Sequence, residues 1–339
     1  MLKVDAFNHI WPQDFYQALT RVTGTMTDIT RRSEAQPMMT QLGERFAIMD
    51  LYDEYQQILS LGSPPLELVA TPDQQIELAR IGTDSMAELC ARHPDRFPGF
   101  VATPPMGAGS EAILEASRHA IEQAGAVGMQ IYTHVNGRPI DEAEFAPFFD
   151  YMAKMDLPVW LHPARSAKMA DYPTEEKSKY EIWWTFGWPY ETSAAMARLV
   201  FSRTFDRLPK LKVITHHGGG MVPFFEGRVG PGWDVLGERT SDEDYGALLK
   251  KLNHRPIDYF RRFIADTATF GAAGSIRLAM DFFGSDQIVF ASDAPFDPEG
   301  GRMFIRETIR ALDAMDMPEA TRAAIYHGNL GRLTRRDFG

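Results

Sequence analysis

Residues 128–161 have the sequence GMQIYTHVNGRPIDEAEFAPFFDYMAKMDLPVWL, in which two short apolar runs flank a longer amphipathic segment. The runs Gly128–Ile131 and Pro158–Leu161 have the length of buried strands, whereas Glu142–Met155 has the spacing of a helix with one apolar face. A strand, a helix and a second strand in this order predict a right-handed βαβ unit with parallel strands.

The same alternation extends in both directions from this stretch. Six more strands and four more helices are expected: strands at Leu2–Phe7, Tyr55–Leu61, Gly99–Ala102, Lys212–Thr215, Phe263–Asp266 and Gln287–Ala291, and helices at Asp73–Arg92, Glu111–Gln123, Ser193–Phe205 and Gly271–Phe283. About eight such units close naturally into a barrel, so the sequence predicts a TIM-type (β/α)8 barrel that occupies residues 1–339 as one domain. A doubly wound open sheet is the alternative, but no Gly-x-Gly-x-x-Gly turn follows the first strand.

Two long connections interrupt the alternation, one from Trp11 to Thr40 and the other from Ala164 to Trp188. The second connection is rich in tyrosine and tryptophan. Long loops on the strand-end side of a barrel usually form walls or lids of an active site. The alternatives are a hydrophobic plug over the barrel and a contact between subunits.

Composition narrows the possible partners and location. The 339 residues carry a formal net charge of −11, which argues against a nucleic acid or a membrane surface as partner, since both favour a basic face. No apolar stretch approaches the roughly 20 residues of a membrane span, and Met1–Asp5 does not resemble a signal peptide. The single cysteine, Cys90, cannot form an internal disulfide, so a cytoplasmic protein is expected.

Histidine and aspartate gather where the expected strands end. His9 follows the first strand, His162 the fifth, the pair His216-His217 the sixth, and Asp293 the eighth. A lone histidine is more often a satisfied core residue, but four strand ends with such residues are hard to explain in that way. Because reactive groups of a barrel lie at these ends, and imidazole and carboxylate suit zinc, manganese or iron, the pattern predicts a catalytic metal site.

Short motifs spread over nearly the whole chain carry a family resemblance. They are VDAFNH (4–9), DRFPGF (95–100), HVNG (134–137), LHP (161–163), PKLKV (209–213), HGGG (217–220), SD (292–293) and GN (328–329). Together they resemble the decarboxylase-type branch of the amidohydrolase superfamily, which includes aminocarboxymuconate-semialdehyde decarboxylase and γ-resorcylate decarboxylase. The resemblance implies a metal-dependent barrel enzyme.

The resemblance also implies which residues hold the metal. The family ends its first strand in His-x-His or Glu-x-His, whereas this chain has Phe7-Asn8-His9, so Phe7 takes the place of a usual ligand. Alternation along a strand is expected to put Asp5, Phe7 and His9 on one face and Asn8 on the other. His9, His162 and Asp293 would then hold a divalent metal, zinc or manganese, and a metal-free site is the alternative.

Further roles follow from the same resemblance. His217 matches the catalytic histidine of the family and would move a proton beside Asp293, and no role carries over to His216. Arg45 and Arg228 resemble arginines that grip a substrate carboxylate, the second of them contributed by a partner subunit. The alternative for each arginine is a surface ion pair. His134 is expected to line the pocket or to serve the structure.

The resemblance implies a nonoxidative decarboxylase, a carbon–carbon lyase, acting as a homodimer on a small aromatic or muconate-like carboxylate. A metal-dependent hydrolase or hydratase of a small carboxylate, lactone or ester is the first alternative, because an activated water serves these reactions as well. A non-enzymatic binder of a small molecule is the second. Release of carbon dioxide distinguishes the first two, and metal analysis tests the third.

Overall fold

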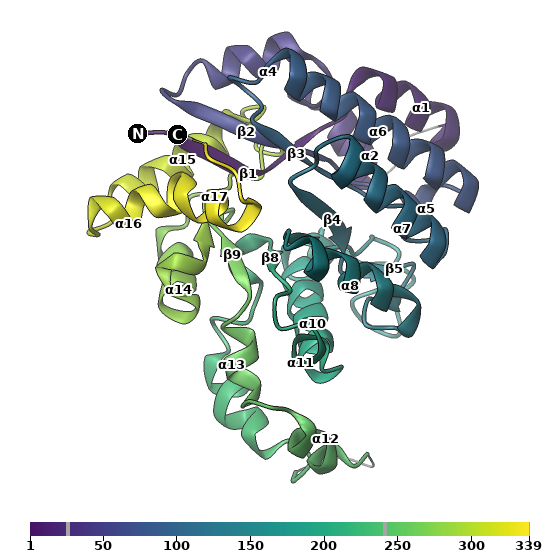
Figure 1. Cartoon of the computed structure of the whole chain (residues 1–339), viewed down its shortest axis with the longest axis vertical. Helices are drawn as coiled ribbons and strands as arrows, with labels where there is room; N and C mark the ends of the chain where they lie inside the picture. The colour runs from purple at the N-terminus through teal and green to yellow at the C-terminus, as the bar shows by residue number, and fades with distance from the viewer. Residues whose placement is uncertain (25–27, 240–242, 339) are drawn as a thin grey trace.

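A computed structural model describes residues 1–24, 28–239 and 243–338, and its centre is a sheet of eight parallel strands (Figure 1). The strands follow one another around the sheet in chain order: β1 Lys3–Ile10, β2 Tyr55–Leu61, β3 Gly99–Ala102, β4 Gly128–Tyr132, β7 Val159–His162, β8 Val213–Thr215, β9 Ile264–Asp266 and β10 Ile288–Val289. A parallel bridge between Asn8 and Ala294, with a 2.9 Å bond from the Asp293 amide to the Phe7 carbonyl, brings the two edges together. The predicted TIM-type barrel is confirmed.

Helices cover the outside of the barrel between successive strands (Figure 1). The main ones are α6 Pro72–Arg92, α7 Ser110–Arg118, α8 Ala146–Met155, α10 Gly187–Phe201, α14 Ala273–Phe283 and α15 Arg302–Asp313. The longest, α6, begins with a capping box in which Thr71 and Gln74 satisfy each other's backbone amides, with Pro72 at the first helical position. The start predicted from the sequence, Asp73, therefore differs by one residue from the observed start at Pro72.

Shorter elements complete the chain. They are α1 Gln13–Thr23, α2 Asp28–Glu34, α3 Pro37–Thr40, α4 Leu42–Met49, α5 Leu66–Val69, η1 His119–Gln123, β5 His134–Val135, β6 Arg138–Pro139, η2 Ala143–Phe145, α9 Ile182–Thr185, α11 Thr204–Arg207, η3 His217–Gly219, η4 Arg228–Gly232, η5 Trp233–Val235, α12 Tyr245–Lys251, α13 Pro256–Phe260, η6 Ser285–Gln287, α16 Glu319–Ala323, η7 Ala324–Gly328 and α17 Asn329–Thr334. Apart from residues 25–27, which lie outside the described residues, the connection from Trp11 to Thr40 is largely helical.

The predicted helix Ser193–Phe205 is wrong at both ends. The helix α10 begins at Gly187, because Pro189 lies in its first turn, where a missing amide hydrogen costs nothing. It ends at Phe201, and Arg203 has a left-handed φ of 62° before α11 begins. The aromatic connection from Ala164 is correspondingly shorter than the sequence suggested.

A β-bulge in β1 changes which of its side chains face the barrel interior. The pairing with β2 shifts register between Asp5 and Asn8, and Val4, Ala6 and Phe7 all join the inner apolar cluster. Asp5 lies on the opposite side, where Tyr55 donates its hydroxyl hydrogen at 2.5 Å. The expectation that Asp5 shares a face with Phe7 and His9 is therefore wrong, because a bulge breaks the two-residue alternation.

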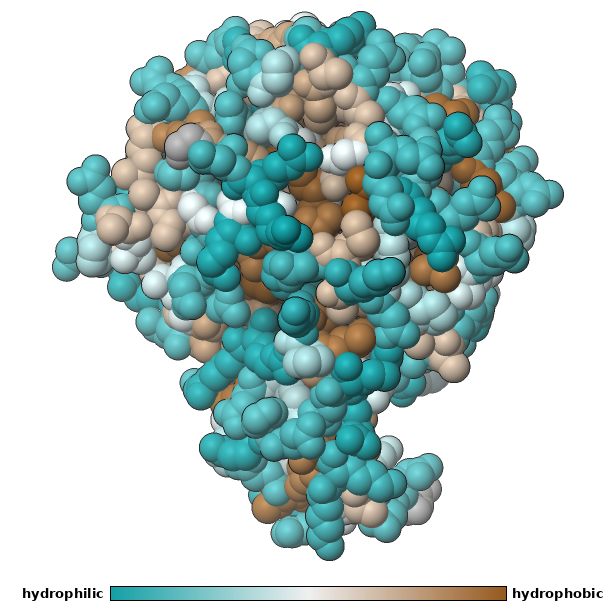
Figure 2. Space-filling view, in the orientation of Figure 1, coloured by the Kyte–Doolittle hydropathy of each residue, from teal (hydrophilic) through white to brown (hydrophobic). Residues whose placement is uncertain are grey.

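The chain between η3 and β9 leaves the barrel and carries α12 and α13 at the lower end of the view (Figure 1). Hydrophilic side chains cover most of the visible face, with hydrophobic patches toward its middle and near this lower end (Figure 2). None of the described helices combines the length and apolar character that a membrane crossing needs.

Candidate metal centre and pocket

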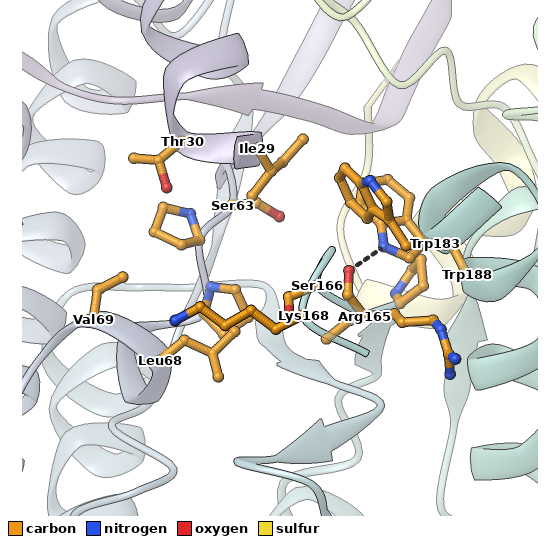
Figure 3. A pocket seen from close by; sticks show the side chains of 14 residues that line it. Ile29, Thr30, Ser63, Leu68, Val69, Arg165, Ser166, Lys168, Trp183 and Trp188 are labelled. Atoms are coloured by element: carbon orange, nitrogen blue, oxygen red, sulfur yellow. Dashed lines mark hydrogen bonds between the residues drawn. The ribbon is translucent and has the colours of Figure 1, made fainter. Parts of the chain in front are cut away.

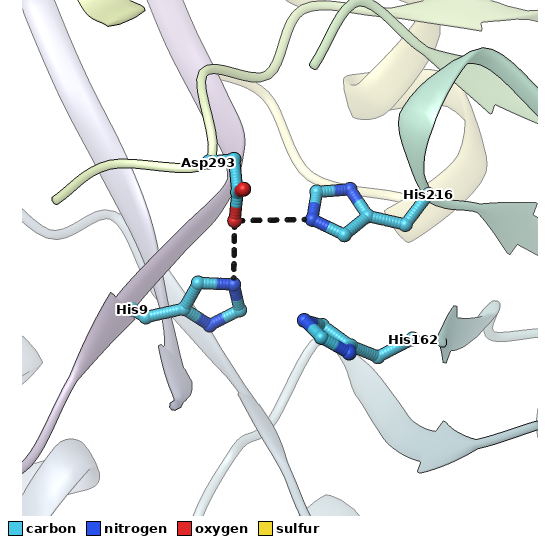
Figure 4. A group of neighbouring side chains, drawn as sticks. All are labelled: His9, His162, His216 and Asp293. Atoms are coloured by element: carbon cyan, nitrogen blue, oxygen red, sulfur yellow. Dashed lines mark hydrogen bonds and ion pairs between the residues drawn. The ribbon is translucent and has the colours of Figure 1, made fainter. Parts of the chain in front are cut away.

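Four side chains meet at the C-terminal end of the barrel (Figure 4). His9 lies in β1, His162 ends β7, His216 directly follows β8, and Asp293 lies in the turn after β10. One ligand atom from each lies within 4.8 Å of the others, and all four residues are buried. Asp293 Oδ1 is 3.2 Å from both His9 Nε2 and His216 Nε2. Residues that are far apart in the sequence thus meet where parallel strands end side by side.

The Nδ1 atoms of the three histidines all contact oxygen atoms on the outer side of the cluster. His162 Nδ1 lies 2.8 Å from the Pro163 carbonyl, and His216 Nδ1 contacts the Asp266 carboxylate. His9 Nδ1 lies 3.2 Å from Ser60 Oγ, whose own hydrogen is donated to the Asn8 carbonyl. Because each of these oxygens accepts, the Nδ1 atoms carry the hydrogens. The Nε2 atoms are therefore directed to the centre of the cluster.

Asp266 orients His216 from behind. Its Oδ1 accepts hydrogen bonds from the Gly218 amide at 3.0 Å and the Ala268 amide at 3.1 Å, and its Oδ2 faces His216. Burial alone would lower the pKa of His216, but Asp266 and Asp293 together raise it to about 9. The same pairing holds the pKa of Asp293 well below its usual range although burial opposes it. Charge in this buried cluster is therefore balanced between imidazole and carboxylate.

The donor set fits a divalent metal. His9 Nε2 is buried and, within the described residues, makes no hydrogen bond despite its proximity to Asp293. A buried nitrogen lone pair without a partner is costly unless a cation or a donor satisfies it. Three imidazoles and one carboxylate, with a carboxylate or an oxygen supporting each ring, suit zinc or manganese.

His217 and Phe7 extend this cluster as stacked rings. The Phe7 ring lies 4.0 Å from that of His216 at 19°, and the His217 ring lies 3.8 Å from the other side at 23°. His217 Nδ1 contacts the Ala268 carbonyl at 2.9 Å, so this nitrogen carries the hydrogen and Nε2 can accept one. Burial lowers the pKa of His217 to about 4, which makes its neutral form the one present near neutral pH. Nε2 of His217 is therefore an unprotonated nitrogen beside the cluster.

An unusual backbone conformation orients the side chains of Asp293 and His217. Asp293 has φ of 66° and His217 has φ of 57°, both in the left-handed region that favours glycine. Gly219 also has a positive φ, and a β-carbon there would approach the Phe283 ring to 2.6 Å. The glycines after His217 thus serve close packing of the turn against α14, and the strained positions lie at the site itself.

A pocket of about 160 Å³ lies between the connection after β7 and residues 29–30 and 63–69 (Figure 3). Pro163, next to His162, lines it, and so do Trp183 and Trp188. The Trp188 ring lies 5.8 Å from that of His162 and stacks with that of His217 at 10° and 6.3 Å. Its indole nitrogen donates to the Arg165 carbonyl at 3.2 Å, which fixes the ring. The connection after β7 therefore forms an aromatic wall of the pocket.

Arg45 lies outside this pocket and is completely buried. Its Nη1 donates to Asn8 Oδ1 at 3.1 Å and Gln57 Oε1 at 2.6 Å, and its Nη2 contacts the Met38 and His9 carbonyls. These acceptors occupy the Nη hydrogens that a substrate carboxylate would need. The expected substrate contact is corrected accordingly: Arg45 holds the end of β1 and thereby positions His9.

The other two expected substrate residues are also apart from the cluster. Arg228 is exposed, with its guanidinium 5.4 Å from the centre of the Phe225 ring. His134 lies in the β5–β6 hairpin, where its Nδ1 accepts the Gly137 amide at 3.2 Å, and it is not among the residues that line the pocket. Neither residue meets His9, His162 or Asp293 within one chain.

Sequence reasoning left His216 without a role, and the structure places it in the cluster. Its position after Val213–Thr215 was one available signal, since side chains alternate along a strand and Ile214 faces the barrel interior. His216 has the same parity as Ile214, which predicts an inward side chain. His217, with the opposite parity, reaches the site only through its left-handed turn.

The fold and this site define a metal-binding barrel, and the chain belongs to the amidohydrolase family, which it matches over residues 4–333. It is similar to the γ-resorcylate decarboxylase of Rhodococcus jostii, with 27% identity over 304 residues that cover 86% of this chain and 87% of that protein. It is also similar to the 2-amino-3-carboxymuconate-6-semialdehyde decarboxylase of Dictyostelium discoideum, with 28% identity over 273 residues, 80% of this chain and 70% of that protein.

Solved structures extend the likeness in fold. A dihydroxybenzoic acid decarboxylase from Polaromonas, determined with bound manganese and an inhibitor, superimposes with a TM-score of 0.78 and 24% identity. The match covers 98% of this chain and 97% of that protein. The resemblance inferred from short motifs is thus confirmed, and the relatives are carboxy-lyases within the amidohydrolase superfamily.

Proposed function

We propose that this protein is a metal-dependent nonoxidative decarboxylase of a small aromatic or muconate-like carboxylate. The observation that carries the proposal is the convergence of His9, His162, His216 and Asp293, with every Nδ1 engaged and every Nε2 directed inward, beside a pocket with an aromatic wall. The decarboxylases among its relatives support the choice of reaction.

These four residues would hold the ion, zinc or manganese. When bound, a divalent ion supplies Lewis-acid polarisation of a substrate oxygen and neutralises developing negative charge. The four residues extend the set of His9, His162 and Asp293 that the family resemblance implied. Asp266 and Ser60 would keep the rings of His216 and His9 in place, as outer carboxylates and hydroxyls do in other metal sites.

His217 would handle the proton that replaces the carboxylate. In the reaction the bond between the ring carbon and the carboxylate carbon breaks, its electron pair stays on the ring carbon, and carbon dioxide leaves. That carbon then needs one proton. Neutral His217 would relay this proton: its Nε2 takes a proton from a water molecule, which is left as hydroxide, and passes it to the ring carbon, while the Ala268 carbonyl holds the Nδ1 hydrogen. Trp188, stacked on His217, would keep bulk water from this path.

We also infer a homodimer in which Arg228 serves the partner's pocket. Phe186, Tyr190 and Phe224 are exposed, and Phe224 is 75% exposed. The turn that bears Phe224 is tied to α10 by a 2.8 Å bond from the Met221 amide to Ser193 Oγ. Several exposed aromatic residues on neighbouring elements favour a protein partner. Light scattering of purified Phe224→Asp should then give a monomer where the unaltered chain gives a dimer.

Two broader properties belong to the same proposal. The match to the amidohydrolase family over residues 4–333 supports one functional domain for the chain. The presence of a single cysteine, Cys90, which is unpaired, supports a cytoplasmic location, because no internal disulfide is available for an oxidising compartment.

Metal analysis combined with a screen for carbon dioxide release tests the main proposal. Purified protein loaded with zinc or manganese should release carbon dioxide from one or more hydroxybenzoates or muconate-like acids. The variants His162→Ala and Asp293→Ala should lose bound metal and activity while keeping the barrel, because both residues lie at strand ends outside the packed layers. Hydrolysis of a lactone or ester without carbon dioxide release, or full metal occupancy in both variants, would contradict the proposal.

A further inference from the structure

The four side chains of the candidate metal centre are sealed from solvent. His9 and His216 have no exposed surface, and His162 and Asp293 are only 2% and 4% exposed. A ligand can therefore reach these residues only when the groups that cover them move aside. Sites that exclude water in this way commonly open through the motion of a loop.

Aromatic rings from two separate segments cover the cluster. The Phe296 ring, from the turn after β10, lies 5.5 Å from the His9 ring. The Trp188 ring, in the first turn of α10, lies 5.8 Å from the His162 ring, and the Trp184 ring of α9 lies 6.5 Å from that of Trp188. All three covering residues are half-buried, so they lie between the buried cluster and solvent. The cover therefore has two parts, Phe296 on one side and the two tryptophans on the other.

Arg32, in α2, joins the two parts of this cover. Its Nη2 donates a 2.8 Å hydrogen bond to the Phe296 carbonyl, and its guanidinium lies 5.9 Å from the centre of the Phe296 ring. The same guanidinium lies 5.1 Å from the centre of the Trp184 ring, within the range of a cation–π contact. Within the described parts of the chain, the Phe296 ring makes no direct ring contact with Trp184 or Trp188. Arg32 is therefore the link between the two parts.

The link is of a kind that can break and form again. Among the described residues Arg32 has no carboxylate partner, so one hydrogen bond to a neutral carbonyl and two ring contacts hold its guanidinium. The side chain is also half-buried, so water can replace these contacts. Release of Arg32 therefore leaves no unpaired charge in the interior, whereas rupture of a buried ion pair would.

The segment that bears Trp184 begins in a strained conformation. Tyr180 and Glu181 have φ of 54° and 58°, in the left-handed region that disfavours residues other than glycine. Tyr180 is 91% exposed, so little packing holds it in place. Glu181 Oε2 accepts a 2.6 Å hydrogen bond from Trp184 Nε1, which couples this pair of residues to the cover. A return to an ordinary backbone conformation here would relieve the strain and move Trp184.

We propose that Arg32 is the latch of a lid over the cluster. In the closed state it ties Trp184 to Phe296, and its release lets α9 move away so that a ligand can enter. Arg32 acts through the two rings and is therefore a positioning residue. The inference concerns access to the cluster, so it goes beyond the proposed decarboxylation and holds for any reaction at this site.

Chemical modification of the cluster histidines measures how often the lid is open. Full-length protein, freed of metal by chelation, is treated with diethyl pyrocarbonate at neutral pH. Peptide mass spectrometry follows the modification of His9 and His162, with the exposed His254 as the internal reference. The two buried rings react only from the open state, so their rate reports its population. Loss of a charge-assisted hydrogen bond changes an equilibrium constant roughly tenfold, and Arg32→Met should therefore raise the rate roughly tenfold.

Matched variants separate a latch from a general loosening of the fold. Arg31→Met removes an exposed arginine of the same helix and should leave the rate unchanged. Trp184→Leu should also raise the rate, and the double variant should react within about twofold of Arg32→Met, because the same link is lost only once. The single thiol, Cys90 on α6, should react with a thiol reagent equally fast in all variants.

Four results would overturn the inference. They are an unchanged rate in Arg32→Met, an equal rise in Arg31→Met, effects of Arg32 and Trp184 that simply multiply, and a matching rise at Cys90. Failure of the proposed decarboxylation would not affect these measurements, because they use neither substrate nor bound metal.

Discussion

The buried carboxyl group of Glu67 gives a prediction whose magnitude follows from the structure. Glu67 lies in α5 beside the pocket wall and is 6% exposed, and its Oε1 has no hydrogen-bond partner among the described residues. Burial raises its pKa from 4.5 to about 7. We therefore expect Glu67→Gln to stabilise the fold at high pH, because glutamine has nearly the same shape and cannot ionise.

The sign and size of the effect follow from proton linkage. A carboxyl whose pKa is raised on folding binds more protons in the native state between pH 4.5 and 7, so the free energy of unfolding falls as pH rises through that window. One pKa unit corresponds to about 1.4 kcal/mol, so ionisation of Glu67 costs about 3 kcal/mol above pH 7. Below pH 4.5 glutamic acid and glutamine are both neutral, and the two proteins should be nearly equal in stability.

Urea unfolding of the original protein and of Glu67→Gln at pH 4.5, 6 and 8 measures this difference. The variant should gain about 3 kcal/mol relative to the original protein at pH 8, a partial gain at pH 6 and little at pH 4.5. Glu115→Gln, on the exposed surface of α7, is the matched control and should show no such trend. A gain that is the same at all three pH values, or no gain at pH 8, would refute the reasoning.

Three further predictions concern the site. Asp266→Asn should weaken metal binding by about 10–100-fold, because it removes the carboxylate that contacts His216 Nδ1, and competition with a chelator measures this affinity. An unchanged affinity would exclude a positioning role for Asp266. His217→Asn should retain metal but slow turnover by about 10²–10⁴-fold in a carbon dioxide release assay, and near-normal turnover would mean that another group moves the proton. Phe7→Ala should lower the free energy of unfolding by about 3–5 kcal/mol in urea titrations, because it leaves a cavity where a fully buried ring stacks on His216. A loss under about 1 kcal/mol would show that neighbouring side chains refill the space.

Much of the barrel could be predicted from local pattern. The strands β2 and β3 agree residue for residue with the predicted ranges, and the other strands differ by a few residues at their ends. Buried parallel strands have continuous apolar runs, and the helices between them show the apolar spacing of one covered face. These signals are local, so a single sequence carries them. The helix around Ser193–Phe205 shows the limit, because the left-handed turn that follows its end lies at Arg203, a residue type that does not mark such turns.

Only part of the candidate site could be predicted from the sequence. His9, His162 and Asp293 could be predicted because their positions at strand ends and their residue types are visible in the sequence. The sequence did not show that His216 joins the cluster or that Arg45 lies outside the pocket. Both facts depend on which groups meet across different strands.

The sequence by itself determined the fold class, the family and the position of the site at the C-terminal strand ends, because periodicity, motifs and residue types are properties of the chain. The tertiary structure alone decided the place of His216 in the cluster, the stacking of Phe7 and His217 on either side of it, and the burial of Arg45. The physical reason is the bulge in β1 together with the left-handed turns at His217 and Asp293. Each reverses the direction of a side chain through long-range hydrogen bonds, and no local sequence pattern specifies those partners.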